Sequence, residues 1–578
     1  MDGIENGNRR TLNCRQARSA ASLQRVAAAA HTDGCDGAAL FASLGTSGAH
    51  PGNSARDMIR ALKPDSIQTY DIETLGMCRD GAARQVKASV ILPHEMWRQL
   101  SNAGALHAVM GHPSLWHSFW QAVQNEEWFT NHPMRYFCLE YGHKACPVVI
   151  HGDGAPIGKQ HSKRALRVVQ WSSPCSSGST LERKIIIATN PEHAALKDLN
   201  ERDIDTVIAW SFEIALANVM PRNDHRGQPL TGQRAREAGK VLNKDGCIMI
   251  YIGTCGDWKF IKDQYKLDNH YGCNACCHMC FGNRTCEPYM QNALPDAPWT
   301  MVMRSSQDFV TLKVAQQELS PWCGMPGWHL HSLFEDAVHD DLLGVRQDLC
   351  GGALMRMVDR QWFCPMSGAG DWKTKANRAL AVAWARFGKW LRNNQLSCTT
   401  TPFSVTTLSL KTRKSKPALK CKASNCAKVS KWIAEECSEF ARQDENEHNA
   451  ILNMTLQGFC DLYVLYHIKG IMTPRQARQL EDARQRSLLG FNALTSLESE
   501  DGRQYFVVKP KFHKLDHLLR RAVRTRVSPS AYWTFQDEDM MGIMASLARN
   551  CRLLLQGPAQ RWLVHYFSDT LPALIGDQ

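Results

Sequence analysis

CPVVIHGDG, residues 146–154, runs an apolar strand directly into a carboxylate that is held between two glycines. Val148, Val149 and Ile150 are β-branched residues typical of a buried strand, and Asp153 follows them closely. A carboxylate at this position is placed to hold a metal ion. The alternative interpretation is that Asp153 is only a turn residue after the strand, because Gly-Asp-Gly sequences commonly form turns.

Three more strand-like runs follow along the chain. RALRVVQWSS (164–173) and KIIIATN (184–190) are broken by Gly, Ser and Pro, which predicts an antiparallel meander with the first strand. CIMIYIG (247–253) is a fourth strand of the buried type, and Asp257 comes just after its end. Two strand-end aspartates on adjacent strands, Asp153 and Asp257, could share a divalent cation.

Paired carboxylates of this kind suit phosphoryl transfer to water or to a DNA 3′-hydroxyl. Two metal ions roughly 3.5–4 Å apart can hold the attacking and the leaving oxygen. Hard oxygen ligands prefer Mg²⁺ or Mn²⁺. The sequence therefore predicts a magnesium- or manganese-dependent site.

The composition favours a large globular protein with a nucleic-acid partner. The chain has 578 residues, 44% of them hydrophobic, and a formal charge of +12, which indicates several domain equivalents with a well-filled core. The basic residues are clustered, as a polyanion partner requires. We find no apolar run of roughly 18 residues, so we expect no transmembrane helix.

Cysteine usage indicates metal binding rather than disulfides. The chain has 22 cysteines and no secretion signal, which favours reduced thiols. CNACCHMCFG (273–282) offers two C-x-x-C pairs back to back, Cys273/Cys276 and Cys277/Cys280. Such a pair presents two thiolates to one zinc ion, which leaves two further ligands to be found.

The missing ligands are predicted at His513 and His517, whose spacing places both imidazoles on one face of a helix. A zinc ion shared with the cysteines would close a long insertion. It would also bring a distant acid back to the two aspartates, and that acid should follow the histidines. Taken alone, either half of this site is also compatible with residues that bind no metal.

FQDEDMMG (535–542) begins a helix with three neighbouring acids. We select Glu538 as the third carboxylate ligand, with Asp539 and Asp537 as the neighbouring candidates. The alternative is that these acids only favour the positive end of the helix dipole.

At this point the residues resemble the DDE/D transposases with a ribonuclease-H-like core, in particular the eukaryotic cut-and-paste group that includes CACTA-type enzymes and the recombination-activating recombinase. They are also similar to transposase-like open reading frames of dinoflagellate genomes. DAVHDDLLGV (336–345) is similar to the D-x-M-H-x-x-x-L-G-V signature of CACTA-type enzymes, with Val338 in place of Met. The matching residues, in chain order, are Asp153, Asp257, Cys277, Cys280, His513, His517 and Glu538.

The resemblance implies an α/β fold, with a ribonuclease-H-like mixed-sheet core interrupted by a large α-helical insertion and preceded by a disordered N-terminus. It implies a DNA transposase that cleaves and joins DNA with Mg²⁺, a structural Zn²⁺, a nuclear location and assembly as a homodimer or larger oligomer. The doubled Cys276-Cys277 leaves the zinc pair open, and Asp336 remains an alternative third ligand.

The expected domains follow from this resemblance and from composition. They are a disordered leader (1–60), a helical N-terminal subdomain (61–140), the first part of the core with the C-x-x-C knuckle (141–280), a mainly helical insertion (281–505) and C-terminal helices that complete the core (506–578). Apolar periodicity predicts helices over 376–394, 429–440, 450–468 and 474–491.

Two basic clusters are candidates for phosphate contact, although a charged loop is often only solvated. One is a loop with Lys411, Arg413, Lys414 and Lys416. The other lies shortly before Glu538 and consists of Arg520, Arg521, Arg524 and Arg526.

Two other functional classes remain open. The chain could be a catalytically inactive, zinc-stabilised DNA-binding relic of a transposable element, or a ribonuclease-H-like nuclease without strand transfer. The relic predicts zinc without cleavage, the nuclease predicts cleavage without joining, and the transposase predicts both.

Overall fold

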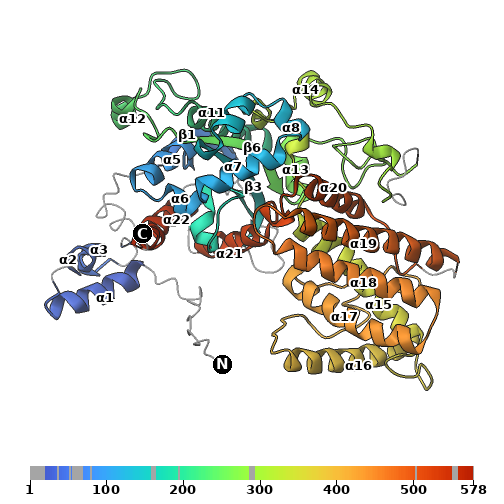
Figure 1. Ribbon diagram of the computed structural model, residues 1–578. Helices are drawn as coiled ribbons and strands as arrows, with labels where there is room; N and C mark the ends of the chain where they lie inside the picture. Colours follow the sequence, from blue (N-terminus) through green and yellow to red (C-terminus); the bar gives the residue numbers. More distant parts are fainter. Residues whose placement is uncertain are drawn as a thin grey trace, which may run out of the picture.

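The computed structural model describes residues 20–35, 38–50, 54, 69–77, 81–157, 165–192, 195–285, 293–500, 504–549 and 557–576. Its centre is a mixed six-stranded sheet with the strand order β1-β2-β5-β4-β3-β6 (Figure 1). The strands are β1 (Tyr70–Met77), β2 (Ala83–Val90), β3 (Ala145–Pro156), β4 (Ala165–Ser172), β5 (Ile185–Pro191) and β6 (Ile248–Gly256).

The predicted meander is confirmed, because β3 pairs antiparallel with β4, and β4 pairs antiparallel with β5. The fourth predicted strand, β6, pairs with β3 in parallel. The carboxyl ends of β3 and β6 therefore lie at the same edge of the sheet.

Asp153 lies inside β3 and not after it, contrary to the sequence interpretation of a strand-end or turn residue. β3 continues to Pro156, and Asp153 is paired with Val168 of β4. Gly152 and Gly154 do not end the strand because β4 supplies pairing partners for both of them. Asp257 does follow the end of β6, as predicted.

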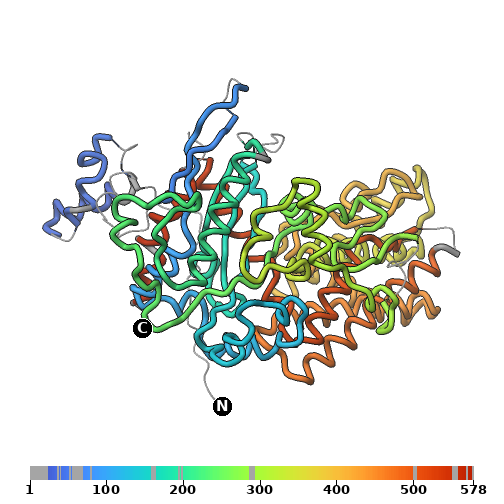
Figure 2. The backbone as a smooth tube through the Cα atoms, turned by 90° about the horizontal axis from the view of Figure 1, so that it is seen from above, coloured from blue at the N-terminus to red at the C-terminus, as the bar shows by residue number. Residues whose placement is uncertain are grey.

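The β1–β2 hairpin corrects the first part of the predicted helical subdomain (61–140), whose remainder contains the helices α5 (Pro93–Asn102) to α9 (Arg135–Glu140). The two strands pair antiparallel along their full length, and β2 joins the sheet through Val90 and Ala188 of β5. Figure 2 shows this hairpin, in blue, extending away from the rest of the sheet. The first half of β2 is accordingly exposed, whereas Ala88, Ser89 and Val90 are buried.

Helices follow the hairpin and surround the sheet. They contribute an aromatic core, since Trp97, Trp116, Trp120 and Trp128 are all buried. Helix α11 (Arg202–Ala217) packs against β6, and α21 (Phe535–Arg549) packs against β3. The other helices around the sheet are α5 (Pro93–Asn102), α6 (Leu106–Met110), α7 (Pro113–Val123), α8 (Glu127–Thr130), α9 (Arg135–Glu140), α10 (Thr180–Arg183), α12 (Gly232–Glu237), α13 (Trp258–Tyr265), α14 (Ser306–Ala315), α22 (Gly557–His565) and α23 (Leu571–Gly576).

A second hydrophobic core lies in the predicted helical insertion. Figure 1 shows its helices, drawn in yellow to orange, gathered beside the part that contains the sheet. Each of the four periodic segments forms a helix, as predicted. The helices of this unit are α15 (Arg346–Asp359), α16 (Trp372–Asn393), α17 (Ala423–Gln443), α18 (Glu447–Tyr466) and α19 (Pro474–Glu500), followed by α20 (Pro510–Thr525).

Half of the expected disordered leader (1–60) lies outside the described residues, and the described half is mostly helical, which corrects the expectation of disorder there. Within that range the structure describes the helices α1 (Ala20–Thr32), α2 (Ala39–Ala42) and α3 (Leu44–Ser47). No helix among the described residues is both long enough and apolar enough to cross a membrane.

A close contact between backbones sets the position of both aspartates. Gly152 of β3 lies opposite Gly256 of β6 in the parallel ladder. A Cβ atom at Gly256 would lie 2.8 Å from the Gly152 carbonyl oxygen, and one at Gly152 would lie 2.0 Å from the ring of Phe260. Only glycine fits at Gly152, because any side chain would overlap the Phe260 ring.

We therefore expect Gly152→Ala to lower the free energy of unfolding by about 1–3 kcal/mol through overpacking. Gly154→Ala is the matched control on the other side of Asp153, since its Cβ would only meet Glu192 Oε1 at 3.4 Å. Denaturant unfolding of both variants measures the difference. Equal stability of the two variants would contradict the packing argument.

Candidate active site and metal centre

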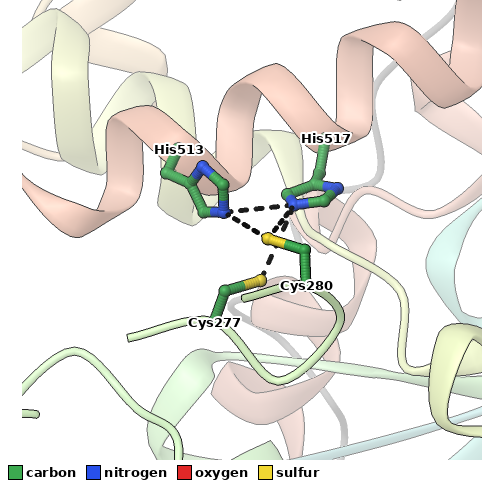
Figure 3. A group of neighbouring side chains, drawn as sticks. All are labelled: Cys277, Cys280, His513 and His517. Atoms are coloured by element: carbon green, nitrogen blue, oxygen red, sulfur yellow. Dashed lines mark hydrogen bonds between the residues drawn. The ribbon is translucent and has the colours of Figure 1, made fainter. Parts of the chain in front are cut away.

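Four buried side chains from distant parts of the chain meet in one cluster: Cys277, Cys280, His513 and His517 (Figure 3). Cys280 Sγ lies 3.2 Å from His513 Nε2, Cys277 Sγ lies 3.6 Å from His517 Nε2, and the two Nε2 atoms are 3.1 Å apart. A tetrahedral zinc ion with ordinary Zn–S and Zn–N bonds holds its ligand atoms roughly 3.3–3.8 Å apart. The cluster thus has the dimensions and the ligand types of a structural zinc site.

Local structure explains why these four atoms converge. His513 and His517 lie one turn apart on α20, so their imidazoles project from the same face. The C-x-x-C turn directs its own backbone at the sulfurs, because Met279 N–H donates to Cys277 Sγ and Gly282 N–H donates to Cys280 Sγ, each at 3.3 Å. Such donors stabilise thiolates and orient them toward a metal.

The environment of Cys277 favours the thiolate. Burial opposes ionisation, but the Cys280 thiol and the two imidazoles outweigh it and hold the pKa of Cys277 well below its usual range. The same contact with Cys277 raises the pKa of Cys280 above its usual range, so the bias toward the thiolate applies to Cys277 alone, and zinc binding would deprotonate both.

The structure also selects between the two C-x-x-C pairs. Cys277 and Cys280 are the pair that faces the histidines, whereas Cys273 is half-buried with its sulfur 3.2 Å from His270 Nε2. Among the described residues, Cys277, Cys280, His513 and His517 (the Cys277–His517 group) are the one set of three or more His, Cys, Asp or Glu residues whose ligand atoms all lie within 4.8 Å of one another.

The three predicted carboxylates come from three different elements. Asp153 lies on β3, Asp257 caps the start of α13 by accepting a 2.5 Å hydrogen bond from Phe260 N–H, and Glu538 lies in the first turn of α21. Asp153 and Glu538 are hydrogen bonded to each other. The charges of Asp257 and Glu538 both act on Asp153, so the three acids lie in one neighbourhood, although their oxygen atoms do not all lie within 4.8 Å of one another.

Crowding of like charges perturbs this group. Burial, then Asp257 and Glu538, raise the pKa of Asp153 to about 7. Burial also raises the pKa of Glu538, although His339 and the hydrogen bond from Asp153 work in the opposite direction. A site where carboxylates stay close and retain a proton near neutral pH is one that a divalent cation would neutralise.

The two acids beside Glu538 serve other contacts. Asp537 is buried against the sheet, where its carboxylate accepts from Lys184 Nζ at 2.8 Å and from Gln170 Nε2 at 2.7 Å. Asp539 accepts from Thr180 Oγ1 at 2.7 Å. Of the three neighbouring acids, Glu538 is therefore the one directed at Asp153.

Asp336, the other alternative ligand, is occupied by hydrogen bonds. Its carboxylate accepts from Thr534 Oγ1 and His339 Nδ1, each at 2.6 Å, and from the backbone N–H groups of Val338, His339 and Thr534. Burial opposes its ionisation, but these donors hold the pKa of Asp336 below its usual range. We place it outside the carboxylate group.

His339 is a site residue to which the sequence analysis gave no role. Its Nδ1 is held by Asp336, and its Nε2 lies 3.4 Å from Glu538 Oε1. Burial works against its protonation, but Asp336 and Glu538 outweigh burial and raise the pKa of His339 to about 9. It belongs to the D-x-x-H signature and lies in a π-helical segment, η9 (Val338–Val345), a distortion common at functional sites. The D-x-x-H signature was the sequence feature that could have identified His339 as a site residue.

A buried ion pair lies between the two centres. Lys514, which lies between the metal-centre histidines on α20, donates to His278 Nδ1 at 2.9 Å and lies 3.4 Å from Glu335 Oε1. Its ammonium group also sits 5.0 Å from the Trp258 ring centre, and Trp258 follows Asp257 directly. The metal centre is thus packed against the element that carries the second aspartate.

The arginine cluster divides into two side chains that form contacts within the protein, Arg520 and Arg521, and two that are exposed, Arg524 and Arg526. Phosphate contact by this cluster stays a prediction. Arg520 donates to Asp516 and to three backbone carbonyls, and Arg521 pairs with Glu335 and Glu126. Arg524 also pairs with Glu126, although 61% of its side chain remains exposed. Arg526 is exposed, with its backbone in the left-handed region at φ 61°.

The basic loop is different, because Lys411, Arg413, Lys414 and Lys416 are all exposed. Arg413 has a distant ion pair with Asp359 at 3.9 Å. The three lysines of this loop form no ion pair with any residue that the structure describes.

No family model matches this sequence, and no curated protein matches it significantly.

Cys277→Ser is expected to lose the zinc that the wild-type chain should carry at about one ion per chain, and to unfold at a lower temperature. Metal analysis of the purified proteins and thermal unfolding measure both effects. Cys273→Ser is the matched control and should keep its zinc. Retention of zinc by Cys277→Ser would rule out the assigned ligand pair.

Asp153→Asn should stabilise the protein at pH 8 in the presence of a chelator, because it removes a carboxylate that is costly to ionise there. The pKa of Asp153 is raised, so its stabilising contribution is complete at low pH and is lost as the pH rises through about 7. The gain should therefore shrink at pH 5. Thermal unfolding at both pH values is the measurement, with Asp539→Asn as the control. An equal gain in stability at pH 5 and pH 8 would contradict the claim that burial and neighbouring acids raise the pKa of Asp153.

Proposed function

We propose that this chain is a DDE-type transposase, or a protein derived from one, with a ribonuclease-H-like core that cleaves and joins DNA. The observation that carries the proposal is that Asp153, Asp257 and Glu538, from β3, the end of β6 and α21, lie near enough for their charges to act on Asp153. Three acids from separate elements, with raised pKa values for Asp153 and Glu538, form a group that suits Mg²⁺ or Mn²⁺.

The sheet topology supports the same proposal. A three-stranded antiparallel meander (β3, β4, β5) is extended by a parallel strand, β6, beside the first of its strands. The chain then makes an isolated parallel bridge from Thr254 to Leu333 on the outer side of β6. This is the strand arrangement expected of a ribonuclease-H-like core, with the first acid on the central strand.

The roles of the protein groups follow from their positions. Asp153 and Asp257 would hold the cations, and Glu538 would complete the ligand set, with its carboxylate oriented by His339. Asp336 acts indirectly, because it accepts a hydrogen bond from His339 Nδ1 and so fixes the orientation of the His339 ring. Bound Mg²⁺ would activate the attacking oxygen and stabilise the charge on the scissile phosphate.

The Cys277–His517 metal centre supports the proposal structurally. It joins the segment after β6 to α20, and α21 with Glu538 follows α20 closely. The family resemblance further implies DNA as partner, a homodimer and a nuclear location, and these are parts of the proposal. The intact metal centre would equally suit a non-cleaving, zinc-stabilised DNA-binding protein, which is the second candidate.

Asp153→Ala and Asp257→Ala are each expected to abolish Mg²⁺-dependent strand cleavage, about a thousandfold or more, while DNA binding is retained. Glu538→Gln should act in the same way. Cleavage and strand joining on supercoiled DNA, with Mg²⁺ or Mn²⁺, measure the effect.

Asp539→Asn is the matched control, since Asp539 is adjacent to Glu538 but bonds to Thr180. Cleavage that survives both aspartate changes would refute the assignment. Cleavage without joining would favour a nuclease, and DNA binding without any wild-type cleavage would favour the DNA-binding relic.

A further inference from the structure

One segment of the helical unit has an extreme charge imbalance. Between Trp372 and Ala434 the chain has fourteen Lys and Arg residues and no Asp or Glu. The formal charge of the whole chain is only +12, so the rest of the protein is close to neutral. The structure describes this segment without a gap, as α16, the connecting loop and the first half of α17.

Helix α16 separates its apolar and basic residues onto opposite faces. Its buried positions recur at helical spacing and define the face that packs onto the unit: Ala376, Ala379, Leu380, Ala383 and Phe387. At about 100° per residue, Lys389 and Arg392 project on the opposite side, and Lys375 lies at its flank. Lys389 and Arg392 are exposed, and Lys375 is partly exposed. Small residues, Ala381 and Ala385, separate them.

The acids nearest to α16 are engaged in other contacts, and one of them, Asp371, caps the helix one turn before Lys375 by accepting from Thr374 N–H. Glu436 of α17 pairs with Arg386 at 3.1 Å, and Glu435 accepts from Trp390 Nε1 at 2.6 Å. Lys375, Lys389 and Arg392 form no ion pair with any residue that the structure describes. By contrast, Arg520 and Arg521 of α20 are paired with buried acids.

The loop between α16 and α17 is fixed against α15. Leu419 N–H donates to Gln347 O at 2.9 Å, and Gln347 Nε2 donates to Cys421 O at 2.8 Å. The backbone is therefore anchored while Lys411, Lys414 and Lys416 remain exposed. Among the large hydrophobic residues of 372–434, Leu396 alone is strongly exposed, so the segment offers little apolar surface for a protein partner.

We propose that the outer face of α16, together with the loop 411–416, binds the phosphate backbone of duplex DNA outside the cleavage site. The 22 residues of α16 extend over about 33 Å, close to one turn of B-form DNA. Small residues between the cations allow the backbone to approach closely. These contacts are independent of sequence, and they deepen the proposed function by assigning where DNA is held away from the three carboxylates.

The test is the salt dependence of DNA affinity, measured by fluorescence anisotropy with the full-length chain and a short duplex of arbitrary sequence. Lys375→Ala/Lys389→Ala/Arg392→Ala should weaken binding about tenfold or more and reduce the slope of log K against log salt by about 2–3. Alanine has a high helix propensity, so the substitutions should leave α16 folded, and circular dichroism can check the helix content of the variant. Lys411→Ala/Lys414→Ala/Lys416→Ala should have a comparable effect.

Arg222→Ala/Arg236→Ala/Lys244→Ala is the matched control, because it removes the same charge at exposed residues near the sheet. An unchanged slope in both surface variants, or an equal loss in the control, would overturn the proposal. Competition by polyglutamate as effective as competition by DNA would also overturn it, in favour of an acidic protein partner. The result is separate from the cleavage test, since surface variants can lose binding whether or not the wild-type chain cleaves DNA.

Discussion

The parallel pairing of β3 with β6 is the constraint on which the rest of the site depends. Its register sets Gly152 against Gly256, and the aspartates that follow these glycines leave neighbouring backbones at the same sheet edge. The absence of side chains at both positions allows the approach, and the Phe260 ring fills the space above Gly152. The pairing brings two negative charges together. As a consequence, the pKa of Asp153 is raised, because its carboxylate is both buried and close to other acids.

The third carboxylate, that of Glu538, reaches this edge only because the chain comes back to the sheet after the long helical insertion. The metal centre supplies a fixed point for that return, since Cys277 and Cys280 follow β6 whereas His513 and His517 precede α21. A metal ion bound by both segments would close a long loop of the chain. Closing a long loop lowers the conformational entropy of the unfolded chain, and in principle the stabilisation of the folded state is larger for longer loops. Lys514 then couples the metal centre to Trp258 and Glu335, beside the second aspartate.

Sequence reasoning recovered the features that depend on local pattern and chemistry. β-Branched runs predicted β3 to β6, apolar periodicity predicted α16 to α19, and ligand types at metal-binding spacing predicted the cysteine–histidine cluster. The β1–β2 hairpin was missed because the sequence analysis relied on continuous apolar runs, whereas β1 alternates buried and exposed residues and the first half of β2 is exposed. The structural roles of Arg520 and Arg521 depend on Glu126 and Glu335, which are too distant in sequence for any local pattern to indicate. The choice of C-x-x-C pair likewise needed the position of α20.

The first turn of α21 illustrates why the three neighbouring acids could not be separated from sequence. Successive residues on a helix project about 100° apart, so three consecutive acids must face three environments. Asp537 enters the sheet and is neutralised by Lys184, Asp539 bonds to Thr180, and Glu538 is left facing Asp153 and His339. Rotating the helix by one residue would bury Glu538 against Lys184 and remove it from the site. The salt bridge between Asp537 and Lys184 therefore fixes the rotation of α21, and through it decides which carboxylate can serve as a ligand.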